Sequence, residues 1–187
     1  RACSGNGELD RVLGGGVVEG AMTLVGGDPG IGKSALVLQV SGHLAKNGAR
    51  VLYASGEESA RQIKMRARRL GIEGDSLYVL AENAMDALET RFMEIAPDYM
   101  VVDSIQTMYR PEMASAPGSV SPVRDSAALL MRLAKTSGCA IFLVGPVPTA
   151  GALAGPRGLA PLVDAVLYFV GDRPHDYRIP RAAHHRF

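Results

Sequence analysis

The sequence predicts an α/β fold in which a mostly parallel central sheet carries helices on both faces. Three observations predict it. Short apolar runs alternate with longer helical patterns, a glycine-rich loop joins one apolar run to a helix, and glycine or proline separates most segments. Such alternation requires crossover connections, which pair strands in parallel. At 187 residues, the chain is expected to form a single domain over 1–187.

Glycine signals bound the elements of the first half of the chain. Gly14-Gly15-Gly16 ends a short first helix, Asn47-Gly48 ends the second, and Gly71 closes a basic third helix, because glycine readily adopts the left-handed conformation found at helix ends. The expected helices are 4–13, 34–47 and 59–70. The expected strands are 21–25, 51–54 and 77–80.

Proline and capping residues bound the second half. Asn83 is expected to cap a helix that Pro97 ends, and Ser121-Pro122 starts a helix that runs to about residue 137. Pro180 has no N–H to donate, so its strand is expected at a sheet edge. The expected strands are 99–103, 140–144, 165–170 and 177–181.

Two stretches are too rich in turn-forming residues for regular structure: 110–121 is rich in proline, serine and glycine, and 145–161 contains four glycines and four prolines. Both are longer than most connections in a compact domain. Either they are disordered, or they project into a channel and grip nucleic acid. Their cations, Arg110 and Arg157, are the candidate DNA-contacting residues.

Composition describes a globular, nearly neutral chain. Hydrophobic residues make up 47% and charged residues 21%, and the net charge of +1 excludes a strongly basic whole-chain surface. No apolar stretch is long enough to span a membrane. The spacing of Cys3 and Cys139 indicates neither a disulfide framework nor a zinc site, so a cytoplasmic location is expected. The chain starts at Arg1 without an initiator Met, and a piece of a longer protein is therefore expected.

The glycine-rich loop fits the pattern Gly-x-x-x-x-Gly-Lys-Ser/Thr, from Gly27 to Ser34. Its backbone N–H groups and the positive end of the following helix converge on one anion. Lys33 then reaches the β and γ phosphates of a nucleotide, and the Ser34 hydroxyl can bind Mg²⁺. ATP and Mg²⁺ are the expected ligands. The candidate nucleotide-binding residues are Gly27, Asp28, Pro29, Gly30, Ile31, Gly32, Lys33, Ser34 and Ala35.

Carboxylates follow two other predicted strands, at the same rim as Gly27. Asp103 closes an apolar strand, as expected of the acid that holds Mg²⁺ through water, although a turn-forming role is the alternative. Glu57 or Glu58 could activate the attacking water as a general base, and each could instead cap the next helix. Glu57 is preferred because it lies nearer the strand end.

Two charged features have less specific interpretations. His184 and His185 lack partner ligands at zinc-binding spacing, which disfavours a metal site there. The helix over 59–70 is locally basic, and its cations either form a solvated face or contact the phosphates of a polymer or a neighbouring subunit. These cations are Arg61, Lys64, Arg66, Arg68 and Arg69.

Several runs together resemble the RadA family of bacterial DNA repair proteins, also called Sms, over nearly the whole chain. The resemblance implies a RecA-like P-loop NTPase core, a hexameric ring, ATP hydrolysis, binding of single-stranded or branched DNA, and branch migration. It implies that Lys33 and Ser34 hold nucleotide and Mg²⁺, that Glu57 activates water, and that Asp103 is the Mg²⁺ acid. The runs are Leu9–Gly16, Gly27–Ser34, Ser55–Ser59, Asp103–Thr107 and Ser115–Val120.

The chain departs from that family in three ways. The family's zinc module and Lon-like domain have no counterpart in the sequence. Pro146-Val147-Pro148-Thr149 stands where the family has His-Val-Thr-Lys. His184-His185-Arg186-Phe187 stands where the family has Lys-Asn-Arg-Phe, leaving Arg186 as the candidate cation for a neighbour's nucleotide. These departures predict intact nucleotide binding but weakened ring-coupled, DNA-stimulated hydrolysis.

Two other functions are therefore kept open. One is a nucleotide-binding assembly or interaction module with weak or no hydrolysis, which the residues at 146 and 184 favour. The other is a small-molecule kinase on the same loop type, for which the sequence contains no acceptor-site signature.

Overall fold

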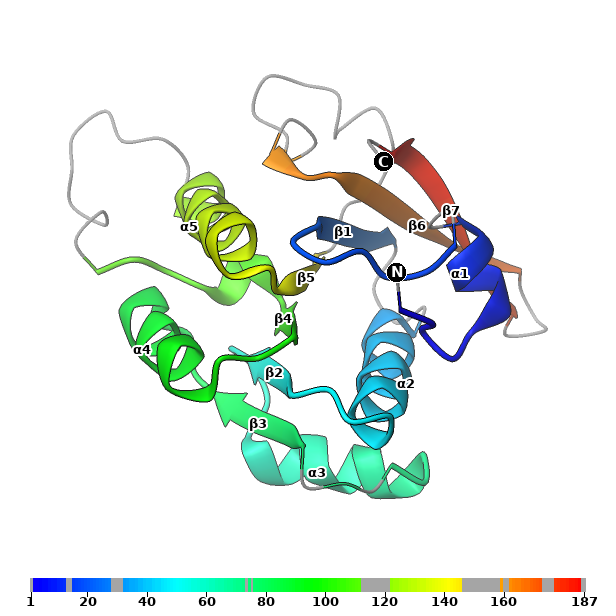
Figure 1. Ribbon diagram of the computed structural model, residues 1–187, viewed down its shortest axis with the longest axis horizontal. Coiled ribbons are helices and arrows are strands. Elements are labelled where there is room, and N and C mark those ends of the chain that lie inside the picture. The colour runs from blue at the N-terminus through cyan, green and yellow to red at the C-terminus, as the bar shows by residue number, and fades with distance from the viewer. Residues whose placement is uncertain are drawn as a thin grey trace.

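The computed structural model describes residues 2–12, 15–27, 32–72, 74, 76–111, 122–145, 159, 162–172 and 177–185. Within this part of the chain, seven strands form one sheet in the order β3-β2-β4-β5-β1-β6-β7 (Figure 1). Every neighbouring pair is parallel except β6 and β7. The strands are β1 (Met22–Gly27), β2 (Val51–Ser55), β3 (Leu77–Ala81), β4 (Tyr99–Asp103), β5 (Ala140–Val144), β6 (Ala165–Asp172) and β7 (Tyr177–His185).

Helices cover both faces of the sheet, as predicted. Figure 1 shows α4 and α5 on one side of the sheet and α2 on the other, with α3 next to the β3 edge. The bounds are α1 (Gly7–Val12), α2 (Lys33–Lys46), α3 (Ala60–Arg69), α4 (Met85–Ile95) and α5 (Pro122–Ser137), with a 3₁₀ helix, η1 (Ile105–Thr107), after β4.

The sheet divides the apolar interior into two clusters. Successive strand residues point to opposite faces. Leu52, Ala54 and Val102 therefore pack with the apolar residues of α4 and α5. Tyr53 and Val101 pack with those of α2 and α3. Because both faces are buried, the central strands are continuous apolar runs rather than alternating ones.

Most predicted element bounds agree with the structure within a few residues, and β4 and β5 agree at both ends. Pro180 lies on the edge strand β7 opposite Phe169, as its missing N–H requires. β6 and β7 are longer than predicted. Cys139 is buried, as expected of a small hydrophobic side chain.

The predicted cap of α4 is wrong. The N-cap is Ala84, which is extended and makes no side-chain capping bond, rather than Asn83. The backbone of Tyr109 makes hydrogen bonds on both sides of Ala84. Its N–H donates to the carbonyl of Asn83 at 2.9 Å, and its carbonyl accepts from the N–H of Met85 at 2.8 Å. This bridge holds Ala84 extended, so the helix begins at Met85.

The strand register places the predicted site segments at one rim, as expected. Ser55 is opposite Asp103, and Asp103 is opposite Val144. Val144 is opposite Val25, two residues before the end of β1. None of the helices in the described part of the chain is long and apolar enough to cross a membrane.

Candidate nucleotide-binding site

The phosphate loop begins where β1 ends and finishes where α2 begins. Gly27 has φ 142° and Gly32 has φ 90°, both in the region that favours glycine. Gly32 is the N-cap of α2 and has no side chain to cover the first N–H groups, whose partial positive charge favours an anion. Asp28, Pro29, Gly30 and Ile31 lie outside the described residues.

Lys33 is the first residue of α2, and its side chain is buried, with 8% exposed. Its Nζ donates to the carbonyl of Gly27 at 2.7 Å and to the carbonyl of Gly145 at 3.2 Å. These carbonyls lie at the ends of neighbouring strands β1 and β5. The ammonium group is therefore fixed at the rim, beside the loop whose phosphate ligand it is predicted to contact.

Ser34 and Asp103 are in direct contact although 69 residues separate them. The Ser34 hydroxyl donates to Oδ2 of Asp103 at 2.7 Å. Asp103 ends β4 and is 8% exposed. The structure therefore brings together the two residues that the sequence predicts for Mg²⁺.

Tyr53 is a site residue that the sequence analysis missed. Its hydroxyl donates to the same Oδ2 of Asp103 at 2.8 Å. Burial raises the pKa of Tyr53 well above its ordinary value, and the Asp103 charge raises it further, whereas nearby Arg66 lowers it. Tyr53 is therefore protonated at neutral pH and acts as a donor. A buried tyrosine hydroxyl needs a hydrogen-bond partner. A tyrosine inside an apolar strand was therefore the sequence feature that could have indicated a polar contact here.

The donor set at this position fits Mg²⁺. A hydroxyl and a carboxylate are hard oxygen ligands, and Mg²⁺ usually binds one or two protein oxygens together with phosphate and water. In the described residues, no group of three or more His, Cys, Asp or Glu side chains could form a complete protein cage. Ser34 and Asp103 would hold the ion next to the phosphates.

Glu57 and Glu58 lie on a turn that follows β2, and their side chains differ in environment. Both backbone N–H groups donate to Oγ of buried Ser55, at 3.3 and 3.1 Å. Glu58 pairs with Arg66 of α3 at 2.8 Å. The side chain of Glu57 is exposed, which leaves it accessible to a reacting water.

A family model described as an AAA domain matches residues 7–151. The chain belongs to this AAA domain family.

Curated relatives of this AAA domain chain confirm the predicted resemblance to RadA. It is 57% identical over 180 residues to a DNA repair protein RadA of Halalkalibacterium halodurans, covering 96% of this chain and 39% of that protein. It is 56% identical over 181 residues to a DNA repair protein RadA of Bacillus subtilis, covering 97% and 40% respectively. The chain thus spans about two fifths of the length of these relatives.

A solved structure confirms the fold class. The crystal structure of a KaiC-like protein from Pyrococcus horikoshii has a TM-score of 0.75 and 19% sequence identity, covering 95% of this chain and 84% of that one. At this identity the likeness concerns the fold alone, and it agrees with the α/β arrangement predicted from the sequence.

The candidate DNA-contacting and inter-subunit residues of the AAA domain chain are only partly described. Arg110 follows η1 and is half-buried. Arg157, Arg186 and Pro146 lie outside the described residues. His184 lies in β7, opposite Val166 of β6.

The cations of the basic helix α3 in the AAA domain chain are of two kinds, one half-buried and paired and the others exposed. Arg66 is half-buried and pairs with Glu58. The remaining cations are exposed. They could form a solvated face or contact the phosphates of a polymer or a neighbouring subunit, as predicted from the sequence. They are Arg61, Lys64, Arg68 and Arg69.

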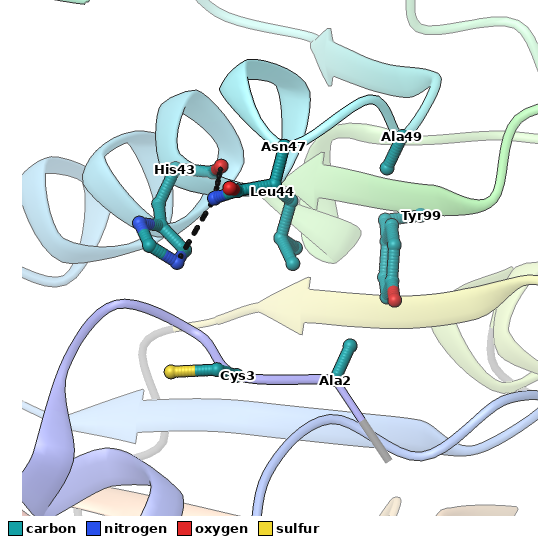
Figure 2. A pocket seen from close by; sticks show the side chains of 7 residues that line it. All are labelled: Ala2, Cys3, His43, Leu44, Asn47, Ala49 and Tyr99. Carbon is teal, nitrogen blue, oxygen red and sulfur yellow. Dashed lines mark hydrogen bonds between the residues drawn. The ribbon is translucent and has the colours of Figure 1, made fainter.

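A second concave region of the AAA domain chain lies at the opposite end of the strands. It is an open cavity of about 260 Å³ between the N-terminal segment, the end of α2 and the start of β4. Figure 2 shows His43 of α2 and Asn47, the residue that follows the helix, lining it, and the Asn47 amide donates to the His43 carbonyl at 2.8 Å. Because Tyr99 begins β4 and Asp103 ends it, this cavity is separate from the phosphate rim.

Proposed function

We propose that the chain is the ATP-binding and ATP-hydrolysing core of a DNA-dependent repair and recombination motor. The observation that carries this proposal is the meeting of Lys33, Ser34 and Asp103 at one rim, beside a glycine loop and the N-terminus of α2. The RadA names of the curated relatives support a role in DNA repair.

In this proposal each residue has a separate task. The loop from Gly27 to Ala35 binds the phosphates through backbone N–H groups, and Lys33 stabilises charge on the β and γ phosphates. Ser34 and Asp103 hold Mg²⁺, which neutralises phosphate charge when bound. Glu57 accepts a proton from the attacking water as the water oxygen bonds to the γ phosphorus and the bond to ADP breaks.

The finer parts of the function concern assembly and DNA. From the resemblance of the sequence runs to the RadA family, we propose a homo-oligomeric ring, a hexamer, that binds single-stranded or branched DNA in the cytoplasm and drives branch migration. Arg110 and Arg157 are the proposed DNA-contacting cations. Arg186 is the proposed cation that acts on the neighbouring subunit's nucleotide.

The test compares ATP hydrolysis by the unmodified chain and by Lys33→Ala, with and without single-stranded DNA. Loss of the ammonium group should reduce turnover at least about 100-fold, because it removes preorganised charge at the phosphates. Lys46→Ala is the matched control, since Lys46 is an exposed lysine at the other end of the same helix. Equal rates for Lys33→Ala and the unmodified chain would contradict the proposal.

The alternative is a nucleotide-binding assembly module with little hydrolysis, favoured by Pro146 and His184 at positions where the resemblance predicts other residues. Tight ATP binding with negligible turnover, whether or not DNA is present, would support this alternative. Brisk DNA-stimulated turnover would exclude it.

A further inference from the structure

Tyr53 connects the centre of the sheet to the acid at its rim. Its side chain has 0% of its surface exposed and packs among the apolar residues beneath α2 and α3. In the β2–β4 register it is opposite Val101, two residues before Asp103. Side chains two residues apart on a strand share a face, so the Tyr53 hydroxyl reaches Asp103 directly.

One carboxylate oxygen of Asp103 accepts two hydroxyl hydrogen bonds. Ser34 donates to Oδ2 at 2.7 Å and Tyr53 donates to it at 2.8 Å. The two donors differ physically. A serine hydroxyl rotates about a short, partly exposed side chain, whereas the Tyr53 hydroxyl is carried by a ring that close packing holds in place. Tyr53 is thus the rigid support of the pair.

We propose that Tyr53 is a positioning residue for Mg²⁺ binding: its hydroxyl fixes the Asp103 carboxylate in the orientation that receives the ion. This inference rests on the proposed function, because it concerns the same metal site. A carboxylate has about four acceptor positions, so a donor at Oδ2 leaves others for the ion or its water. Hydrogen-bond partners that orient metal-binding residues strongly affect metal affinity.

The test is a Mg²⁺ titration of nucleotide binding, followed with a fluorescent ATP analogue, for the unmodified chain and Tyr53→Phe. The variant removes one oxygen and keeps the ring. We expect the Mg²⁺ concentration at half-saturation to rise about tenfold. Binding of the analogue in EDTA should be unchanged, because Tyr53 acts only through Asp103. A residue that merely supported the fold would alter both.

Tyr99→Phe is the matched control. Tyr99 is the first residue of β4 and Asp103 is the last, so the two lie at opposite ends of the same strand. Its Mg²⁺ titration should match that of the unmodified chain. In an Asp103→Asn background, Tyr53→Phe should have no further effect on the Mg²⁺ dependence, since the carboxylate through which it acts is gone.

The outcomes separate two failures. If the unmodified chain binds nucleotide without any Mg²⁺ dependence, the proposed function fails. If the unmodified chain is Mg²⁺-dependent and Tyr53→Phe has the same half-saturation concentration, only the role of Tyr53 is overturned.

A measurement on the unmodified chain covers the case in which Tyr53→Phe does not fold. With ¹³C-labelled tyrosine Cζ, the Tyr53 resonance should shift when Mg²⁺ is added to the ATP-bound chain, while the Tyr99 resonance should not. A Tyr53 resonance that does not respond to Mg²⁺ would overturn the inference.

Discussion

At the scale of single residues, the neighbouring glutamates Glu57 and Glu58 differ in their side-chain contacts. Glu57 and Glu58 share the Ser55 hydroxyl as the acceptor for their N–H groups. Only Glu58 pairs with Arg66, and each partner's side chain is 30% exposed. The Glu58 carboxylate is therefore already engaged by a guanidinium, whereas the exposed Glu57 side chain is open to water. The preference for Glu57 as the general base stays a prediction.

Glu57→Gln should reduce ATP hydrolysis by about 10²- to 10⁴-fold while nucleotide binding persists, because an amide cannot accept the water's proton. Glu58→Gln should reduce hydrolysis by no more than about fivefold, since a partly exposed ion pair contributes roughly 1 kcal/mol or less. Steady-state phosphate release and nucleotide-binding titrations check both variants. The reverse order of severity would reassign the base to Glu58.

Site residues that belong to a local motif or a strand end were easier to predict than those brought in by strand pairing. Lys33 and Ser34 could be predicted as site residues because the spacing of the glycine-rich motif places them at the phosphates. Asp103 could be predicted because it ends an apolar strand. Tyr53 could not be placed in the site because its contact depends on the β2–β4 register, which the sequence does not contain. The same limitation hid the pairing of Arg66 with Glu58.

At the scale of elements, the turn after β2 packs tightly against η1. A Cβ on Gly56 would lie against Oγ1 of Thr107 and 2.8 Å from its Cβ. Thr107 is held in place because its hydroxyl donates to the carbonyl of Ser104 at 2.7 Å. The backbone of Gly56 also donates to the carbonyl of Asp103 at 3.2 Å. This contact positions the turn that carries Glu57.

Gly56→Ala should therefore destabilise the fold by about 1–3 kcal/mol, the usual cost of overpacking. It should also slow hydrolysis, because the turn must move away from η1. Urea denaturation measures the first effect and phosphate release the second. Gly7→Ala is the control: nothing lies within 4 Å of its added Cβ, and alanine is the better helix former. Equal stability of the two variants would contradict the tight packing.

The elements themselves were largely predictable, and the exceptions have one cause. α5 has the predicted bounds because proline at its first position and glycine after its end are local signals. The start of α4 depends on a bridge to Tyr109, 25 residues farther along the chain than Ala84. η1 is packed against α5, another distant segment. Sequence patterns describe local preferences, so contacts of this kind lie outside their reach.

At the scale of the whole molecule, the proposed ring predicts concentration-dependent activity. If Arg186 acts on a neighbour's nucleotide, turnover per chain should rise steeply as chains associate. Turnover and sedimentation measured over the same concentration series check this. Arg186→Ala should remove the rise without affecting nucleotide binding to the single chain. Turnover per chain that stays constant through the association range would contradict a shared site.

The division of the interior by the sheet also bears on how this protein can change. The side chains beneath α2 and α3 include Tyr53, which both packs in the core and donates a hydrogen bond to Asp103. Among the described residues, the layer beneath α4 and α5 does not include Tyr53. Sequence drift should therefore be freer in that second layer, where exchanging one large apolar side chain for another leaves the Tyr53 hydroxyl in place.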